Sequence, residues 1–258
     1  MNKQRLKEKI KSFLNEHHKV LLPDLLYEEL IDADSESDIN KEDFERLLIM
    51  NRFLRESYTG ENDIDGGYKE YEKFFAEVKK NYPDIWREMI EKEGYGEHWK
   101  GIYNPNLRFK NKKQIGKIYL SIDKKDLANF AFELLSKIAF KPNQIDDYNF
   151  KINNGEQKNR TDNLVIYLYS PEDLDKYLEI IASILRNSPQ IIINESHLLG
   201  EEVQKGVVVV SGEDHGKVSF SYIICRQICK LVQNGVSLDY IADSVHQKLA
   251  LSNNLHKH

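Results

Sequence analysis

The chain has 258 residues, of which 40% are hydrophobic and 31% are charged, and its formal net charge at pH 7 is −5. The length suits one large domain or two modest ones, since domains cluster near about 100 to 200 residues. The composition excludes a disordered chain and a membrane protein, and the acidic balance argues against a nucleic-acid binder. No signal peptide is visible at the amino terminus, so we expect an intracellular protein.

The first hundred residues are predicted to be mostly helical. Apolar residues at helical spacing predict helices at 1–20, 25–31, 44–54 and 68–78, and a short one at 85–90 after Pro83. Residues 24–65 are strongly acidic, and the stretch 34–38 has no apolar side chain to bury, which is typical of a solvated loop. We therefore assign residues 1–104 to a helical region that binds a peptide or a partner.

The sign of the charge then reverses. Residues 100–117 contain six basic side chains and no acidic one. Such a run is typical of a solvated loop and a strand edge, but a local positive field can also attract phosphate to an acidic protein. Both interpretations remain open at this point.

Strands alternate with helices in the second half of the chain. Strands are predicted at 115–122, 148–152, 164–169, 190–194 and 205–211, and helices at 123–139, 170–186, 220–232 and 238–251. Ser170 suits the N-cap of its helix and Pro171 the first helical position. The strands at 148–152 and 164–169 are expected to pair as a hairpin around a long polar loop. The order predicts an α+β fold, with residues 105–258 forming a small mixed or antiparallel sheet flanked by helices.

Familiar catalytic motifs are absent from the sequence. It has no phosphate-binding glycine loop, dinucleotide fingerprint, zinc-protease histidine motif, paired Cys-x-x-Cys or esterase nucleophile motif. Cys225 and Cys229 lie four residues apart in an apolar periodic stretch, which favours two small core residues over a metal or redox site. We expect no metal and no cofactor.

A succession of short segments resembles one known family. The segments lie at 117–122, 150–151, 160–167, 206–207, 219–220 and 225–226. Their order and approximate spacing are similar to those of the Hop outer-protein A family, type III effectors of plant pathogens with relatives in bacterial peptide-modification pathways. The resemblance spans roughly half of the chain, and its succession of motifs is more specific than any single motif.

The resemblance implies a phosphate-eliminating lyase. Relatives in class V lanthipeptide and thioamitide biosynthesis remove phosphate from phosphoserine or phosphothreonine of a precursor peptide, which leaves dehydroalanine or dehydrobutyrine. The implied partners are a phosphorylated precursor peptide and a kinase-like protein, with no nucleic acid and no membrane. The implied location is the cytoplasm, or export through a dedicated effector system if the chain is an effector.

One motif departs from the family's pattern. The family often has Ser-Phe-Gly and then a His-Arg pair, whereas here Ser221 replaces the glycine and Ile223 and Ile224 occupy the positions of the pair. If the family's arginine binds phosphate, this chain must use Arg226 or another cation, or it has lost the activity. The alternative is therefore a non-catalytic effector or partner subunit that binds a peptide, a chaperone or a host protein.

The elimination implied by the resemblance needs a base, a donor to the enolate-like oxygen and cations around the departing phosphate. A lysine can be the base only if burial or positive charge lowers its pKa from about 10.4. The catalytic candidates are Lys151 as base, His215 as proton donor to phosphate and Tyr119 as donor to the enolate; the expected phosphate ligands are Arg160, held by Asp162, together with Lys117 and Arg226. Lys217 is the next candidate for the base. We expect Lys117, Lys151, Arg160 and Arg226 to share one pocket, although each residue also fits an ordinary surface or packing role.

Overall fold

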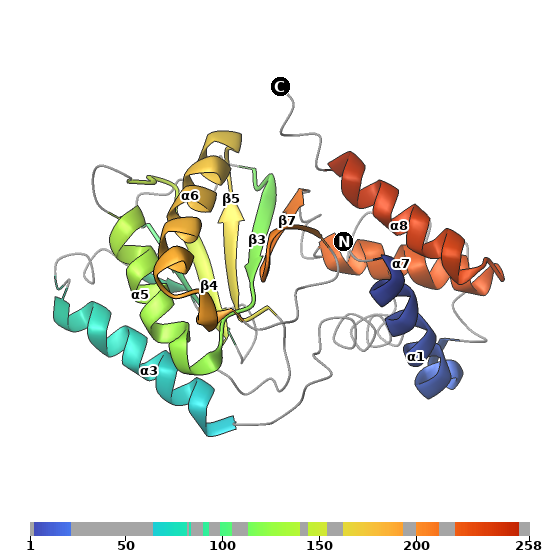
Figure 1. Cartoon of the computed structure of the whole chain (residues 1–258), viewed down its shortest axis with the longest axis horizontal. Coiled ribbons are helices and arrows are strands. Elements are labelled where there is room, and N and C mark those ends of the chain that lie inside the picture. Colours follow the sequence, from blue (N-terminus) through green and yellow to red (C-terminus); the bar gives the residue numbers. More distant parts are fainter. Residues whose placement is uncertain are drawn as a thin grey trace. The chain divides into compact units, whose positions relative to one another are not determined.

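The computed structural model describes residues 3–21, 64–81, 83, 90–92, 99–104, 113–139, 144–153, 162–192, 200–211 and 220–252. Contacts divide the chain into two compact units. Unit 1 comprises residues 1–56, 198–201 and 210–258, and unit 2 comprises residues 57–197 and 202–209. The helices and strands of both units are labelled in Figure 1. No helix in the described ranges has the length and apolar character that a membrane crossing requires.

A seven-stranded sheet organises unit 2. Its strands, in spatial order, are β1 (Ile90–Lys92), β2 (Trp99–Tyr103), β4 (Asn149–Asn153), β5 (Leu164–Leu168), β3 (Gly116–Leu120), β7 (Val207–Ser211) and β6 (Glu201–Gln204). The pairs β1–β2, β2–β4, β4–β5 and β5–β3 are antiparallel. The pairing of β4 with β5 confirms the predicted hairpin.

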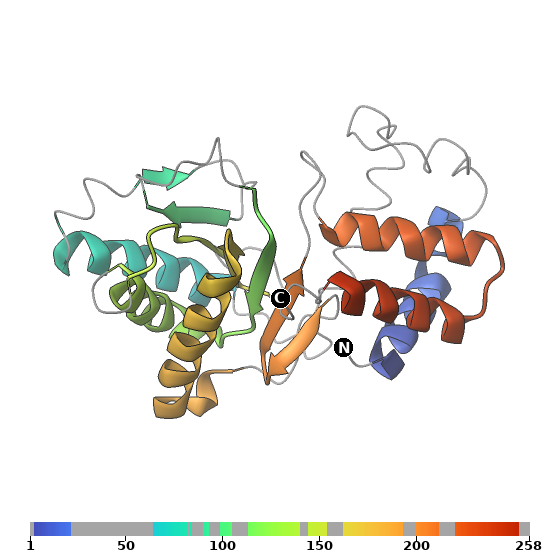
Figure 2. The same ribbon diagram turned by 90° about the horizontal axis from the view of Figure 1, so that it is seen from above.

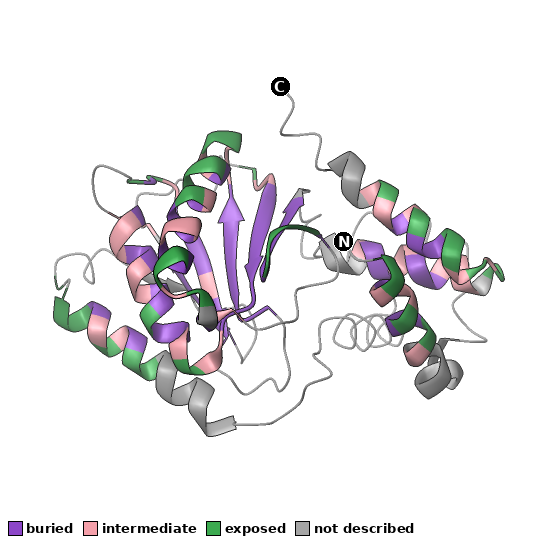
Figure 3. Cartoon of the chain, in the orientation of Figure 1, coloured by how far each residue is buried: buried purple, intermediate pink, exposed green. Residues whose placement is uncertain are grey.

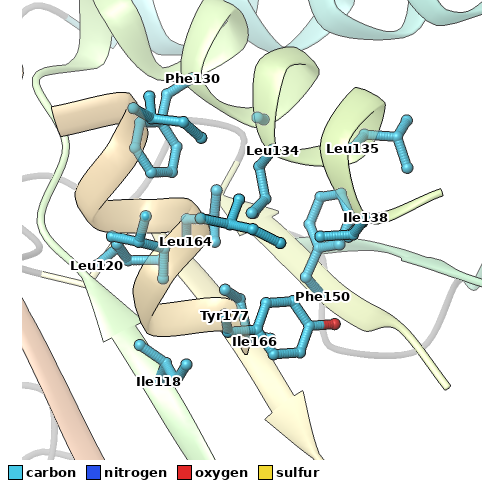
Figure 4. Packing of buried hydrophobic residues seen from close by; sticks show 14 of the residues in the cluster. Ile118, Leu120, Phe130, Leu134, Leu135, Ile138, Phe150, Leu164, Ile166 and Tyr177 are labelled. Atoms are coloured by element: carbon cyan, nitrogen blue, oxygen red, sulfur yellow. The ribbon is translucent and has the colours of Figure 1, made fainter. Parts of the chain in front are cut away.

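Helices cover one face of this sheet. They are α3 (Ile64–Asn81), the 3₁₀ turn η3 (Lys124–Asp126), α5 (Leu127–Ile138) and α6 (Pro171–Asn187), seen from two directions in Figures 1 and 2. Alternate strand residues such as Ile118, Phe150 and Ile166 point into this layer, where they are fully buried with the apolar stripes of α5 and α6. Figure 4 shows how closely these side chains pack, and Figure 3 shows that the central strands are almost entirely buried.

The start of α6 follows the sequence signal. The Ser170 hydroxyl accepts a hydrogen bond from the backbone N–H of Asp173 at 3.2 Å, and Pro171 is the first helical residue. This arrangement satisfies one of the N–H groups that the first turn of a helix leaves without a partner. The predicted N-cap is therefore confirmed.

Unit 1 contains three described helices, α1 (Lys3–Leu21), α7 (Phe220–Gln233) and α8 (Leu238–Ser252). Lys3 pairs with Asp243 at 2.6 Å and Lys7 pairs with Asp239, so two ion pairs join α1 to α8. Cys225 and Cys229 are free and buried in α7, as expected for small core residues.

The α+β fold class is confirmed, but several boundaries differ from the sequence prediction. β1 and β2 precede residue 105 and still belong to the sheet, so the division of the chain into units does not follow the proposed boundary between residues 104 and 105. Ile90, assigned to a short helix, lies in β1. The strand expected at 190–194 is wrong at its start, because Pro189–Ile191 form a 3₁₀ turn and Ile192 makes one isolated bridge to Ile122.

Two further differences concern β6 and the amino-terminal helices. β6 was not predicted, since its Glu-Glu-Val-Gln sequence carries no apolar alternation and all four residues are exposed. The helix α3 begins at Ile64, before the predicted start at residue 68. The helices expected at 25–31 and 44–54 lie outside the described residues.

The turn between β6 and β7 depends on glycine. Gly206 has φ 71°, and a Cβ placed there would overlap Cγ2 of Ile192. Its carbonyl also accepts a hydrogen bond from the backbone N–H of Ser121 at 2.9 Å, which ties the turn to the end of β3. Both the backbone conformation and the available space therefore require glycine here.

We expect Gly206→Ala to destabilise the protein more than Gly235→Ala. Gly235 has φ 66° with open space around it, so alanine adds only the backbone strain of about 1–2 kcal/mol, whereas at Gly206 overpacking adds about 1–3 kcal/mol. Denaturant unfolding measures both free energies. Ile192→Ala should restore part of the loss in Gly206→Ala, and equal losses in the two glycine variants would contradict the steric explanation.

Tyr177 makes the stability of the core depend on pH in the alkaline range. Burial, and then the nearby negative charge of Asp173, raise its pKa well above the usual value. Above about pH 10 the unfolded chain releases this phenolic proton while the folded protein retains it, so the free energy of unfolding falls as pH rises. We expect Tyr177→Phe to reduce this alkaline loss in denaturant titrations, and Tyr240→Phe, at a position that is 60% exposed, to leave it unchanged.

Candidate active site

The sheet face opposite the helices carries polar and aromatic side chains. Residues that alternate with the apolar core positions occupy it, because successive strand side chains point to opposite faces. Lys117 pairs with Tyr167 across β3 and β5, and Lys151 pairs with Val165 across β4 and β5. Tyr119 also pairs with Val165, from the other side. We call the set Trp99, Lys117, Tyr119, Asn149, Lys151 and Tyr167 the polar face.

Two lysines of the polar face share one aromatic ring. The Lys117 Nζ lies 5.3 Å from the centre of the Tyr167 ring, and the Lys151 Nζ lies 5.9 Å from it. The Lys151 Nζ is closer still to the Trp99 ring, at 4.6 Å. Contacts of this kind stabilise a cation by about 0.5–2 kcal/mol, with the larger values at desolvated sites. The rings therefore hold two ammonium groups that the chain brings from separate strands.

Burial makes this pair of lysines unusual. Lys117 is only 5% exposed, Lys151 is half-buried, and their neighbours Tyr119, Tyr167 and Trp99 are all buried. Lysine is rarely buried to this extent, because removing an ammonium group from water is costly unless other groups compensate for it. The buried Lys117 and the half-buried Lys151 are therefore the feature of the sheet that core packing alone does not explain.

Asparagines frame the polar face. The Asn149 Nδ2 donates a hydrogen bond to the Tyr169 hydroxyl at 2.8 Å, and no described atom pairs with the buried Asn149 Oδ1. The Asn163 Oδ1 accepts a hydrogen bond from the Ile122 N–H at 3.0 Å, and its Nδ2 donates to the Ile122 carbonyl. Asn163 thus fixes the chain after β3 against the start of β5, which holds Lys117 and Tyr167 in register.

The structure brings together three of the predicted site residues. Lys117, Tyr119 and Lys151 lie on the polar face, and Asp162 is fully buried just before β5. Arg160, His215 and Lys217 lie outside the described residues. The predicted convergence of four cations therefore stays a prediction.

Arg226 belongs to α7 in unit 1. It is half-buried, and burial, and then the charge of Arg226, lower the pKa of Lys248 on α8. Its role as a phosphate ligand stays a prediction.

Sequence reasoning missed the aromatic members of the site. Trp99 could not be found, because the sequence does not predict the strand β2, and the basic run that begins at Lys100 fits a solvated loop and strand edge as well as a phosphate-attracting surface. Tyr167 offered a signal, since it alternates with the core positions Ile166 and Leu168 in a predicted strand. Among the described ranges, no group of three or more histidine, cysteine or acidic residues is arranged to hold a metal ion.

Comparisons with known proteins identify the fold. An effector protein from Pseudomonas syringae pathovar tomato strain DC3000 is 11% identical, with TM-score 0.51 over 93% of this chain and 95% of that one. A second effector, from Pseudomonas syringae pathovar syringae strain 61, is 12% identical, with TM-score 0.52 over 94% of each chain. The chain has the fold of these two effector proteins. The resemblance indicated by the sequence motifs is thereby confirmed for the fold.

A third solved structure is similar over a smaller part of the chain. It is the type III effector and phosphothreonine lyase of Shigella flexneri, 14% identical, with TM-score 0.39 over 59% of this chain and 84% of that one. No protein-family model and no curated protein matches the chain. The fold assignment therefore depends on the two Pseudomonas structures.

We expect the fluorescence of Trp99 to report on Lys151. The substitution Lys151→Met removes the ammonium group that lies beside the Trp99 ring. It should shift the emission of Trp99, because that cation lies 4.6 Å from the ring centre. The measurement is made in Trp86→Phe, which leaves Trp99 as the sole indole. Lys117→Met is the matched control, since Lys117 contacts Tyr167. Equal spectra for the Lys151→Met variant and its parent would contradict the contact.

Proposed function

We propose that the protein is a phosphoserine/phosphothreonine lyase that eliminates phosphate from a phosphorylated peptide. The observation that supports this most strongly is the pair Lys117 and Lys151 beside Tyr167 on the buried polar face. A site for this chemistry needs a cation for the leaving phosphate and a separate amine that can accept a proton. Two lysines on one rigid sheet meet both needs.

Lys151 is the proposed base and Lys117 the proposed phosphate ligand. In its neutral form the Lys151 amine takes the Cα proton, and the electrons of that C–H bond form the Cα–Cβ double bond. The Cβ–O bond breaks, and phosphate departs with its electron pair. Lys117 neutralises that charge, with Arg160 and Arg226 as further proposed ligands and Asp162 as the partner of Arg160. His215 is the proposed proton donor to the phosphate.

Tyr119 is the proposed donor to the enolate-like oxygen. It pairs with Val165, which pairs in turn with Lys151, so the tyrosine and the base lie in the same row across the sheet. A phenol placed there can donate a hydrogen bond to the substrate carbonyl as negative charge develops on it.

The proposed substrate is a phosphorylated precursor peptide in a lanthipeptide-type pathway. A kinase-like partner would supply the phosphoserine or phosphothreonine, because a lyase acts only on an already phosphorylated residue. The support is the sequence resemblance to relatives encoded in such pathways. A phosphorylated host protein is the corresponding substrate if the chain is exported as an effector.

A binding protein without catalysis is the second candidate. It is favoured by Ile223 and Ile224, which replace the family's His-Arg pair, and by the complete burial of Ile224 in α7. An apolar buried residue at this position offers no group to phosphate. On this reading the polar face would hold a phosphorylated ligand without acting on it.

We expect the protein to remove about 98 Da from a phosphothreonyl peptide, as elimination of phosphoric acid requires, whereas hydrolysis would remove about 80 Da. Mass spectrometry after incubation distinguishes the two losses. A protein that binds the phosphopeptide and never changes its mass would establish the second candidate.

Variants should separate the base from the phosphate ligands. Lys151→Ala should abolish elimination and leave phosphopeptide affinity within about a few-fold, because a transition-state interaction affects rate more than binding. Lys117→Ala and Arg160→Ala should each weaken binding by about 1.5–3 kcal/mol. Lys125→Ala is the matched control, since that side chain is 73% exposed on η3. Near-normal elimination by Lys151→Ala would place the base elsewhere.

A further inference from the structure

A groove lies on the helical side of unit 2. It encloses about 580 Å³ between the end of α5 and the part of α6 from Lys176 to Arg186. Its lining includes Lys137, Lys176, Glu179, Ile180, Ser183 and Arg186. The helices α5 and α6 cover the apolar face of the sheet, so the groove shares no residue with the polar face. It is a separate feature of the molecule.

The lining of the groove carries three cations, Lys137, Lys176 and Arg186, and one carboxylate, Glu179. Lys137 and Arg186 stand in the last turns of their helices, where cations complement the helix dipole. Lys176 stands in the first half of α6, four residues after Glu172, a spacing at which opposite charges on an exposed helix surface stabilise the helix slightly. Within the described residues, no carboxylate forms an ion pair with Lys176 or Arg186, and Lys137 has only Glu133 at 3.7 Å. The groove therefore presents positive charge on a protein whose net charge is −5.

The spacing of the charges favours an extended ligand over a compact anion. Lys176 and Arg186 are ten residues apart on one helix, which corresponds to about 15 Å along its axis. A single phosphate cannot contact both, whereas a run of carboxylates can. Between them lies Ile180, 5% exposed, which offers an apolar floor. Glu179 and Ser183 in the lining can accept hydrogen bonds from peptide N–H groups, of which a nucleic-acid backbone has none.

We propose that this groove binds an acidic segment of a partner protein, with carboxylates at Lys137, Lys176 and Arg186 and an apolar side chain over Ile180. The volume suits a short stretch of peptide, since ligand sites commonly enclose about 300–1,000 Å³. The groove acts as a docking surface and takes no part in phosphate elimination, so it stands whether or not the lyase activity does.

The test is fluorescence anisotropy with a labelled 12-residue peptide of glutamates and leucines that carries no phosphate. The double variant Lys176→Glu/Arg186→Glu should weaken binding by about tenfold or more, because it places like charges against the peptide. The matched control Lys79→Glu/Lys80→Glu makes the same change of charge on exposed positions of α3 and should have little effect. Equal losses in both double variants would reduce the binding to general electrostatic attraction and overturn the proposal.

A second pair of variants tests the hollow itself. Ser183→Trp fills the groove without changing charge and should weaken binding as strongly as the charge reversal, while Ala76→Trp on the exposed side of α3 should not. Undiminished binding by Ser183→Trp would overturn the proposal. So would the absence of binding by the unaltered protein, or complete competition by inorganic phosphate or by a single-stranded oligonucleotide at equal charge concentration.

Discussion

The alternation of side chains along β3, β4 and β5 is the constraint on which the rest of unit 2 depends. One set of positions packs under α5 and α6 and forms the hydrophobic core. The other set is almost as deeply buried but carries lysines, tyrosines and asparagines. Because a shift of one residue in register would exchange the two faces, it would place Lys117 and Lys151 in the core and destroy both the packing and the site. Stability and site geometry are thus fixed by the same strand pairing.

This coupling assigns different roles to the two faces. The helix-covered face supplies the free energy that holds the sheet rigid, since burying apolar surface is the dominant favourable contribution to folding. The polar face offsets part of this favourable free energy, because removing ammonium and amide groups from water is costly. Aromatic rings beside Lys117 and Lys151 offset part of that cost. The arrangement resembles active sites in general, where groups that are unfavourable for stability are held in place by a rigid scaffold.

Short-range sequence patterns determine how much of the fold and of the candidate site could be predicted from the sequence. The β4–β5 hairpin, the Ser170 N-cap and the helices α5 to α8 follow from short-range patterns, and the structure contains all of them. β2 and β6 were missed because the short strand Trp99–Tyr103 runs into the basic stretch 100–117 and Glu201–Gln204 has no apolar alternation. Lys117, Tyr119 and Lys151 were found as candidates, yet their shared face became visible only through strand order, which brings Trp99 and Tyr167 beside them. Such long-range pairing is not encoded in any single window of sequence.

The closure of the β4–β5 hairpin has a consequence for how the chain can vary. The Asn153 N–H donates to the Asn163 carbonyl at 2.9 Å, and Asn163 is itself held by Ile122. The strands are therefore locked where the hairpin opens, independently of residues 154–161. Lengthening that connection costs little, because each doubling of its length adds only about 0.6 kcal/mol to the free energy of closing the loop. The connection before the proposed phosphate ligand Arg160 can therefore acquire insertions while the spacing between Lys117 and Lys151 stays constant.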